Sequence, residues 1–161
     1  MEIMIIFAVH IVIMIVGEHI TKLDDKGRLV FPAPLKATAE GERSVKLRFM
    51  LKKDLFSHCL EMFVYEEWEQ ESEKVKGRLN FFNREHAAFW REYMRDRAVV
   101  EPDEKMGRIT IPKRLLDMIG VQKEVVFLGN GHKIEVWAKE RFDEAKIEES
   151  VYVALAEKIL G

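Results

Sequence analysis

The fold is decided by the stretch Asp24-Asp25-Lys26-Gly27-Arg28-Leu29-Val30-Phe31-Pro32, whose pattern recurs as Glu104-Lys105-Met106-Gly107-Arg108-Ile109-Thr110-Ile111-Pro112. In both stretches an acid and two linking residues precede Gly-Arg, three strand-forming residues and a proline. An Asp side chain accepts hydrogen bonds from backbone N–H groups just downstream, and glycine adopts a positive φ without strain. Proline favours the first turn of a helix. The pattern therefore predicts, twice, a tight turn, a short strand and a helix start.

Each motif assigns roles to its charged residues and its glycine. The residues expected to structure the turns are Asp24, Gly27, Glu104 and Gly107. Asp103 stands just before Glu104, and the sequence leaves open which of the two serves the second turn. The residues expected to contact nucleic acid are Lys26, Arg28, Lys105 and Arg108, because lysine binds phosphate and a guanidinium binds phosphate or the edge of a guanine. The alternative is that each arginine only pairs with the acid of its own motif.

The similarity between the two parts of the chain continues beyond the prolines. A short helical segment follows each proline and is closed by a glycine, Gly41 or Gly120, which suits a helix cap. Each part then runs into strand-forming sequence that ends in Met62-Phe63-Val64-Tyr65 or in Ile134-Glu135-Val136-Trp137. One such unit can hardly bury a core alone, so we expect the two copies to pack together as one domain.

The paired motifs, their spacing and the two strand ends resemble the MraZ family over about residues 14 to 145. The resemblance implies an α+β fold in which two tandem AbrB-like units form one pseudo-symmetric swapped-hairpin β-barrel with flanking helices. It also implies a ring-shaped homo-oligomer and a transcriptional regulator that binds direct repeats in the DNA upstream of its own gene. The chain departs from the family in carrying Glu104 where aspartate is usual, and in the bulkier connection formed by residues 52–58.

The resemblance and the positions of the two motifs divide the chain into five parts. The first unit with its helix is expected over residues 14–80, a connecting helix over 81–97, the second unit over 98–145 and a C-terminal helix over 146–161. Residues 1–13 are apolar but too short, and too interrupted by His10, for a membrane span. Because Met14 begins a Met-Ile-Val-Gly-Glu sequence like the opening of MraZ chains, we interpret residues 1–13 as a non-native or mis-called extension.

Local patterns predict the elements between the motifs. A first strand is expected over residues 15–22, and a hairpin over 45–51 and 59–65. Asn83 should cap a helix over Arg84 to Arg97, whose aromatic stripe is expected to lie in the core or in a subunit interface. Gly129-Asn130-Gly131 predicts the turn of a second hairpin, and a helix should run from Lys139 to Leu160.

Composition restricts the class of protein. The net charge of −2 over 161 residues argues against coating nucleic acid by bulk charge. Basic residues instead gather around the two turns, whereas acids concentrate in residues 66–73 and 140–149. Cys59 is the only cysteine and the histidines are scattered, so we expect no disulfide, metal or cofactor. Each motif acid has an arginine close by that keeps it ionised, which argues against a catalytic carboxylate pair.

These observations lead to one interpretation and two alternatives. We expect a cytoplasmic, nucleoid-associated, DNA-binding regulator that is not an enzyme, with no membrane partner and no small-molecule substrate. One alternative is an oligomeric protein-binding scaffold linked to cell division, without specific DNA binding. The other is an AbrB-type antitoxin, which the second fused copy disfavours because such antitoxins build the barrel from two short chains.

Overall fold

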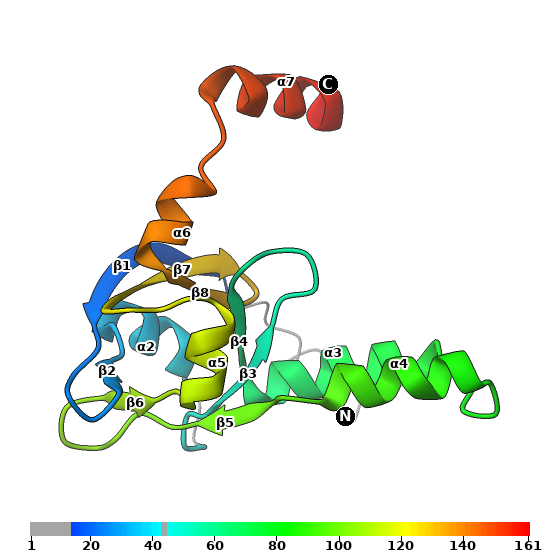
Figure 1. The fold of residues 1–161 in the computed structure, drawn as a ribbon, viewed down its shortest axis with the longest axis horizontal. Coiled ribbons are helices and arrows are strands. Elements are labelled where there is room, and N and C mark those ends of the chain that lie inside the picture. The colour runs from blue at the N-terminus through cyan, green and yellow to red at the C-terminus, as the bar shows by residue number, and fades with distance from the viewer. Residues whose placement is uncertain (1–13, 43–44) are drawn as a thin grey trace.

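The computed structural model describes residues 14–42 and 45–161, so the interpretation of residues 1–13 lies outside the described residues. The strands are β1 (Ile15–Lys22), β2 (Arg28–Val30), β3 (Phe49–Lys53), β4 (Leu60–Val64), β5 (Ala98–Val100), β6 (Arg108–Thr110), β7 (Glu124–Gly131) and β8 (Ile134–Ala138). The helices are α2 (Ala33–Glu40), α3 (Tyr65–Gly77), α4 (Arg84–Met94), α5 (Lys113–Met118), α6 (Lys139–Glu144) and α7 (Glu149–Leu160) (Figure 1). The fold is therefore mixed α+β, as the sequence predicts.

The two parts of the chain exchange strands. A six-stranded antiparallel sheet has the order β1-β7-β8-β4-β3-β5, and β2 pairs with β6 in a second sheet. If β1 to β4 are matched with β5 to β8, the order reads the same from either end, so each part lends its first strand to the hairpin of the other. No pairing joins β1 to β5 among the described residues, and the closed barrel therefore stays a prediction.

The core lies where the two sheets and the short helices α2 and α5 meet. Phe31, directly after β2, packs its ring at 5.1 Å from Phe49 of β3 and at 5.5 Å from Phe127 of β7. All three side chains are buried. Leu29 and Ile109, opposite each other in β2 and β6, cover the same core. One aromatic residue of the first motif thus joins strands from both parts of the chain.

The first strand and the cap of α4 match the sequence prediction, but the environment of α4 does not. β1 covers Ile15–Lys22, and the Asn83 side chain accepts hydrogen bonds from the backbone N–H groups of Glu85 and His86. However, α4 ends at Met94 and none of its residues is buried. Its aromatic stripe is therefore not part of the core of this chain, and the alternative of a subunit interface stays a prediction.

The turn of the second hairpin falls later than predicted. β1 pairs with β7 from Gly17 opposite Gly129 to Ile15 opposite Gly131, and Asn130 N donates to Lys133 O of the returning chain, so the turn is centred on Gly131 and His132, with Gly131 at φ 79°. A Cβ at Gly129 would lie 2.8 Å from the Val16 backbone, so this glycine serves close strand approach and not a turn. Its pairing with the first part of the chain overrides the local turn preference.

The predicted helix from Lys139 to Leu160 is wrong because the chain forms two helices with a break at residues 145–148. α6 is fixed on the sheet by Phe142, whose ring lies 5.9 Å from that of Trp137. Glu148 then has extended backbone and begins α7 as a separate helix. Residues 145–148, where the helix breaks, include neither glycine nor proline.

None of the helices in the described part of the chain is long and apolar enough to cross a membrane.

Replacing Phe31 with alanine tests the central packing. Because the ring is buried between strands from both parts of the chain, Phe31→Ala should lower the free energy of unfolding by about 3 to 5 kcal/mol. Urea denaturation followed by circular dichroism measures this change. Phe82→Ala is the matched control, because the Phe82 side chain is fully exposed and its removal should change stability little. Equal effects of the two substitutions would contradict this description of the core.

Candidate nucleic-acid interface

The first turn is held by the carboxylate of Asp24. Its Oδ1 atom accepts hydrogen bonds from the backbone N–H groups of Lys26 at 2.9 Å and Arg28 at 2.8 Å, and its Oδ2 atom accepts one from Arg28 Nε at 2.8 Å. Gly27 has φ 74°, the positive value that the sequence predicts for this turn. The hydrogen bond from the Arg28 backbone, and then the Arg28 guanidinium, hold the pKa of Asp24 below its usual value.

The second turn has the same construction, but its carboxylate comes from Asp103. Asp103 Oδ1 accepts a hydrogen bond from the Met106 backbone N–H at 2.8 Å, and Oδ2 accepts one from Arg108 Nε at 2.8 Å. The turn has one more residue than the first, since Asp103 N donates to Arg108 O whereas Asp24 N donates to Arg28 O. These hydrogen bonds, the one from the Met106 backbone foremost, lower the pKa of Asp103 to about 2.

The turn-structuring role predicted for Glu104 is therefore corrected to Asp103. The gap-free match between the two motifs pointed to Glu104, because both acids stand three residues before the glycine. Aspartate, with its short side chain, is the acid that folds back onto the backbone N–H groups of its own turn. The sequence does contain the correct acid, Asp103, directly before Glu104. Because the second turn is one residue longer than the first, aligning the two motifs without a gap matched Asp24 to Glu104 instead. Gly107, with φ 67°, takes the predicted conformation.

The two arginines lie on one face of the ribbon formed by β2 and β6. Arg28 is opposite Thr110, and Val30 is opposite Arg108, so the arginines are diagonal neighbours across the two strands. Leu29 and Ile109 point to the other face and are buried. Because side chains alternate along a strand, this register places both guanidinium groups on the solvent side. Their side chains are 29% and 22% exposed.

Each arginine pairs with its turn acid and also remains accessible. The pairing that the sequence left as an alternative is present at both turns. In residues 14–42 and 45–161, however, each guanidinium makes its hydrogen bond through Nε alone. The two terminal nitrogens of each fork stay available for a ligand, and the aspartate fixes their direction. The ion pair thus orients the arginine and does not use up its donors.

The two motif lysines lie on the tips of the same turns. Lys26 and Lys105 are exposed, and neither is in an ion pair in the described ranges. The basic residues of α5 differ from them, because Lys113 pairs with Asp117 and Arg114 with Asp96. All four residues that the sequence selected for nucleic-acid contact are therefore brought to the end of the molecule formed by the β2–β6 ribbon and its turns (Figure 1).

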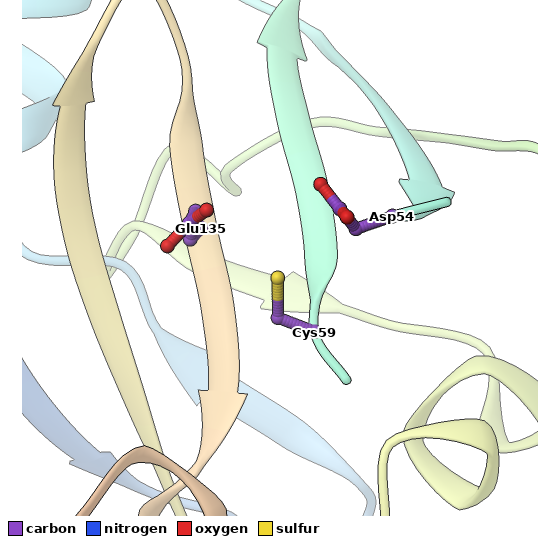
Figure 2. Close-up of side chains that lie close together, drawn as sticks. All are labelled: Asp54, Cys59 and Glu135. Atoms are coloured by element: carbon purple, nitrogen blue, oxygen red, sulfur yellow. The ribbon is translucent and has the colours of Figure 1, made fainter. Parts of the chain in front are cut away.

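A second group of side chains has the ligand types of a metal site: Asp54, Cys59 and Glu135. Figure 2 shows the Cys59 sulfur pointing toward the space between the two carboxyl groups, and their candidate ligand atoms lie within 4.8 Å of one another. The carboxylates already have partners, however. Asp54 accepts hydrogen bonds from the Phe56 and Ser57 backbone, and Glu135 accepts one from the indole of Trp137.

The thiol of this group is neutral near pH 7. Burial, and then the nearby Glu135 and Asp54 carboxylates, raise the pKa of Cys59 to about 12. Lys133, whose Nζ lies 2.7 Å from Glu61 and 3.7 Å from Asp54, already supplies a positive charge. A metal needs the thiolate, so the chemistry of this group favours a structural role over metal binding.

The fold and the interface define a tandem-repeat protein whose two units exchange strands and present two arginine turns on one face. Residues 14–92 and 95–157 match the family model described as "MraZ protein, putative antitoxin-like". A protein of Bacteroides fragilis named "Transcriptional regulator MraZ" is 35% identical over 92% of either chain. One of the same name from Carboxydothermus hydrogenoformans is 34% identical over 91% of this chain and 97% of its own. The chain belongs to the MraZ family.

Replacing the two neighbouring acids distinguishes their roles. Asp103→Ala should lower the urea midpoint and Glu104→Ala should not, because only Asp103 holds the turn. The folded-state pKa of Asp103 lies below the ordinary value of 3.8, so its contribution to stability is present above that value and is lost as the pH falls toward 2. The carbon-13 titration of the Asp103 carboxyl measures this shift directly, and a midpoint near 3.8 would contradict the described turn.

The reactivity of the single cysteine tests its environment. At pH 8 the native protein should react with a disulfide reagent such as DTNB far more slowly than the protein in denaturant, because the Cys59 thiol is buried and its pKa is raised to about 12. Only the thiolate reacts, and the chain has no second cysteine to confuse the absorbance change. Rapid, complete labelling of the folded protein would show that the thiol is accessible.

Proposed function

We propose that the protein is a DNA-binding transcriptional regulator of the MraZ type, which binds direct repeats upstream of its own gene. The relatives from Bacteroides fragilis and Carboxydothermus hydrogenoformans are named as transcriptional regulators, which supports regulation as the role of this chain. We also propose that it acts in the cytoplasm at the nucleoid, as a ring-shaped homo-oligomer. The exchange of strands between units supports a swapped-hairpin barrel as its closed form.

The observation that carries this proposal is the placement of Arg28 and Arg108 on one exposed face of a two-stranded ribbon. The major groove of DNA admits a two-stranded β-ribbon, and an arginine fork pairs with two acceptors of guanine. The Asp24 and Asp103 carboxylates orient the forks in advance, which reduces the entropy lost on binding. Lys26 and Lys105, on the adjoining tips, are placed to contact phosphates.

The net charge of −2 is compatible with this role because the basic groups are concentrated locally. One pair of turns offers few contacts and binds DNA weakly. An oligomer that presents several pairs to spaced repeats gains roughly 10² to 10⁴ in avidity without a new type of contact. The turn carboxylates are unsuited to acid/base catalysis near neutral pH because the pKa values of both are lowered. We therefore propose binding rather than catalysis as the function.

An alternative function is a protein-binding scaffold. It is favoured by apolar side chains that are exposed on α4 and α7, since large apolar surfaces mark sites of protein association. The two functions differ in what they require of the arginines. A regulator needs Arg28 and Arg108 for its interaction with DNA, whereas a scaffold that uses the helices does not.

Binding to DNA tests the proposed function. Fluorescence anisotropy with DNA from upstream of the gene, and with scrambled DNA of equal length, should show a preference for the upstream DNA. Arg28→Ala and Arg108→Ala should each weaken binding to the upstream DNA by roughly tenfold or more, since a lost guanine contact costs about 1 to 3 kcal/mol. Lys26→Ala should weaken binding to both DNAs equally and reduce the dependence on salt.

The control variant is Arg84→Ala, which removes an exposed arginine of α4 away from the ribbon. It should bind like the unaltered protein, and the oligomer mass of every variant should be unchanged. Equal, salt-sensitive binding to both DNAs would reduce the function to non-specific nucleoid association. No binding at low salt would contradict the regulator and favour the scaffold.

A further inference from the structure

Helix α7 presents an apolar face that no part of the chain within residues 14–42 and 45–161 covers. None of its residues is buried, and Figure 1 shows the helix standing away from the sheets beyond the segment 145–148. Four of its exposed apolar residues follow helical spacing and share one face: Val151, Tyr152, Leu155 and Ile159. A helix of 12 residues is marginal in water without packing. The face of α7 therefore requires a partner.

A groove of matching character lies between α4 and the connection from β3 to β4. A cavity of about 390 Å³ is lined by the apolar residues Leu55, Phe89 and Met118, by Tyr93, and by seven charged residues: Lys52, Lys53, Asp54, Glu92, Arg95, Asp96 and Arg97. A second cavity of about 320 Å³ shares Leu55 and Phe89 with it and continues toward α3. Leu55 and Phe89 are largely exposed. The two cavities form one elongated surface, referred to below as the α4 groove.

The α4 groove also contains a guanidinium nitrogen that lacks an acceptor among the described residues. The Arg97 guanidinium lies over the Tyr93 ring at 4.5 Å, and its Nε atom is buried without a hydrogen-bond partner in the described residues. Lys52 contacts the same ring, with its Nζ atom 4.7 Å from the centre of Tyr93. Burial lowers the pKa of both side chains. A buried donor without an acceptor is costly, so a carboxylate entering the groove would satisfy Arg97.

α7 carries a carboxylate in the required place. Glu148 is the N-cap residue of the helix. It stands four residues before Tyr152 and seven before Leu155, so at about 100° per residue it falls within the apolar face. Lys158, seven residues after Val151, lies at the edge of the same face, whereas Glu157 points away from it. The face thus combines apolar side chains with a carboxylate at its start, which complements a groove that holds a guanidinium nitrogen without an acceptor among the described residues.

We propose that α7 of a second copy of this chain binds in the α4 groove, with Glu148 paired to Arg97. A neighbouring copy is the occupant because α7 and α4 lie far apart within one chain, joined to opposite sides of the sheets (Figure 1). Helix and groove are different surfaces, so the contact is heterologous and repeats from copy to copy until the assembly closes. This contact does not involve the β2–β6 ribbon, which stays open in the assembly.

Variants of either surface test the contact by light scattering coupled to gel filtration, without DNA. Leu155→Asp on α7 and Phe89→Asp in the α4 groove should each reduce the oligomer to a monomer. The matched controls should keep the full mass: Val153→Asp replaces an exposed apolar residue on the opposite face of α7, and Phe82→Asp replaces a fully exposed residue outside the groove. Circular dichroism establishes that each variant is folded.

Mixing the two monomeric variants is the decisive step. The Leu155→Asp chain keeps an intact groove and the Phe89→Asp chain keeps an intact α7, so the mixture should form a dimer although neither variant does alone. A mixture that stays monomeric would overturn the proposal. Retention of full mass by Phe89→Asp would also overturn it and point to pairing of α7 with α7.

The ion pair is tested by reversing its charges. Glu148→Arg should weaken the assembly at least tenfold, and adding Arg97→Glu in the same chain should restore it, because every interface then contains the reversed pair. Failure of the double variant to recover, while circular dichroism shows it folded, would contradict the assigned pair. Since all these readouts are free of DNA, their failure would leave the proposed regulator function standing, and a failure of DNA binding would not affect them.

Discussion

Neither part of the chain completes its own fold, and the rest of the structure depends on this constraint. β1 belongs to the first unit but pairs with β7 of the second, and β5 of the second unit pairs with β3 of the first. The three-residue strands β2 and β6 pair only with each other. Their inner residues, Leu29 and Ile109, close the core between the units. Pairing across the units is therefore what gives the two motifs a common surface.

The Asp–Arg contact of each turn gives the side chains on that surface a defined geometry. Exposed ion pairs contribute little to stability, so these pairs matter more for orientation. In both turns Oδ2 of the aspartate accepts from Nε of the arginine, while Oδ1 accepts from the backbone of the turn. The guanidinium is thus tied to the backbone that carries it. In the proposed function, this arrangement gives a chain of net charge −2 a local site for an anionic polymer.

Much of the local structure follows from the sequence because it rests on short-range chemistry. The positive φ of Gly27, the span of β1 and the Asn83 cap depend on residues a few positions apart. The sequence predictions fail where contacts with distant parts of the chain determine the local conformation. Pairing with β1 keeps Gly129 and Asn130 in a strand, although the local sequence favours a turn there.

The site could likewise be predicted in part. Repetition of the Gly-Arg motif located the arginines, whereas the common face of Arg28 and Arg108 depends on the β2–β6 register, which no local pattern contains. Because the second turn has one extra residue, the sequence assigned the turn-structuring role to Glu104, whereas Asp103 accepts the hydrogen bond of the turn. For α4 the periodicity predicted a helix with an aromatic stripe, but it could not tell whether this chain or a partner covers that stripe.

The central claim is that the β2–β6 ribbon contacts guanines in the major groove, and dimethyl sulfate protection of guanine N7 tests it most directly. The DNA upstream of the gene is methylated with and without bound protein, and the modified guanines are located by cleavage. If the ribbon contacts guanines, protected guanines should appear at a regular spacing, with protection weakened at defined positions by Arg28→Ala and at others by Arg108→Ala. Tight binding with no guanine protected, or with a pattern that neither substitution changes, would contradict it.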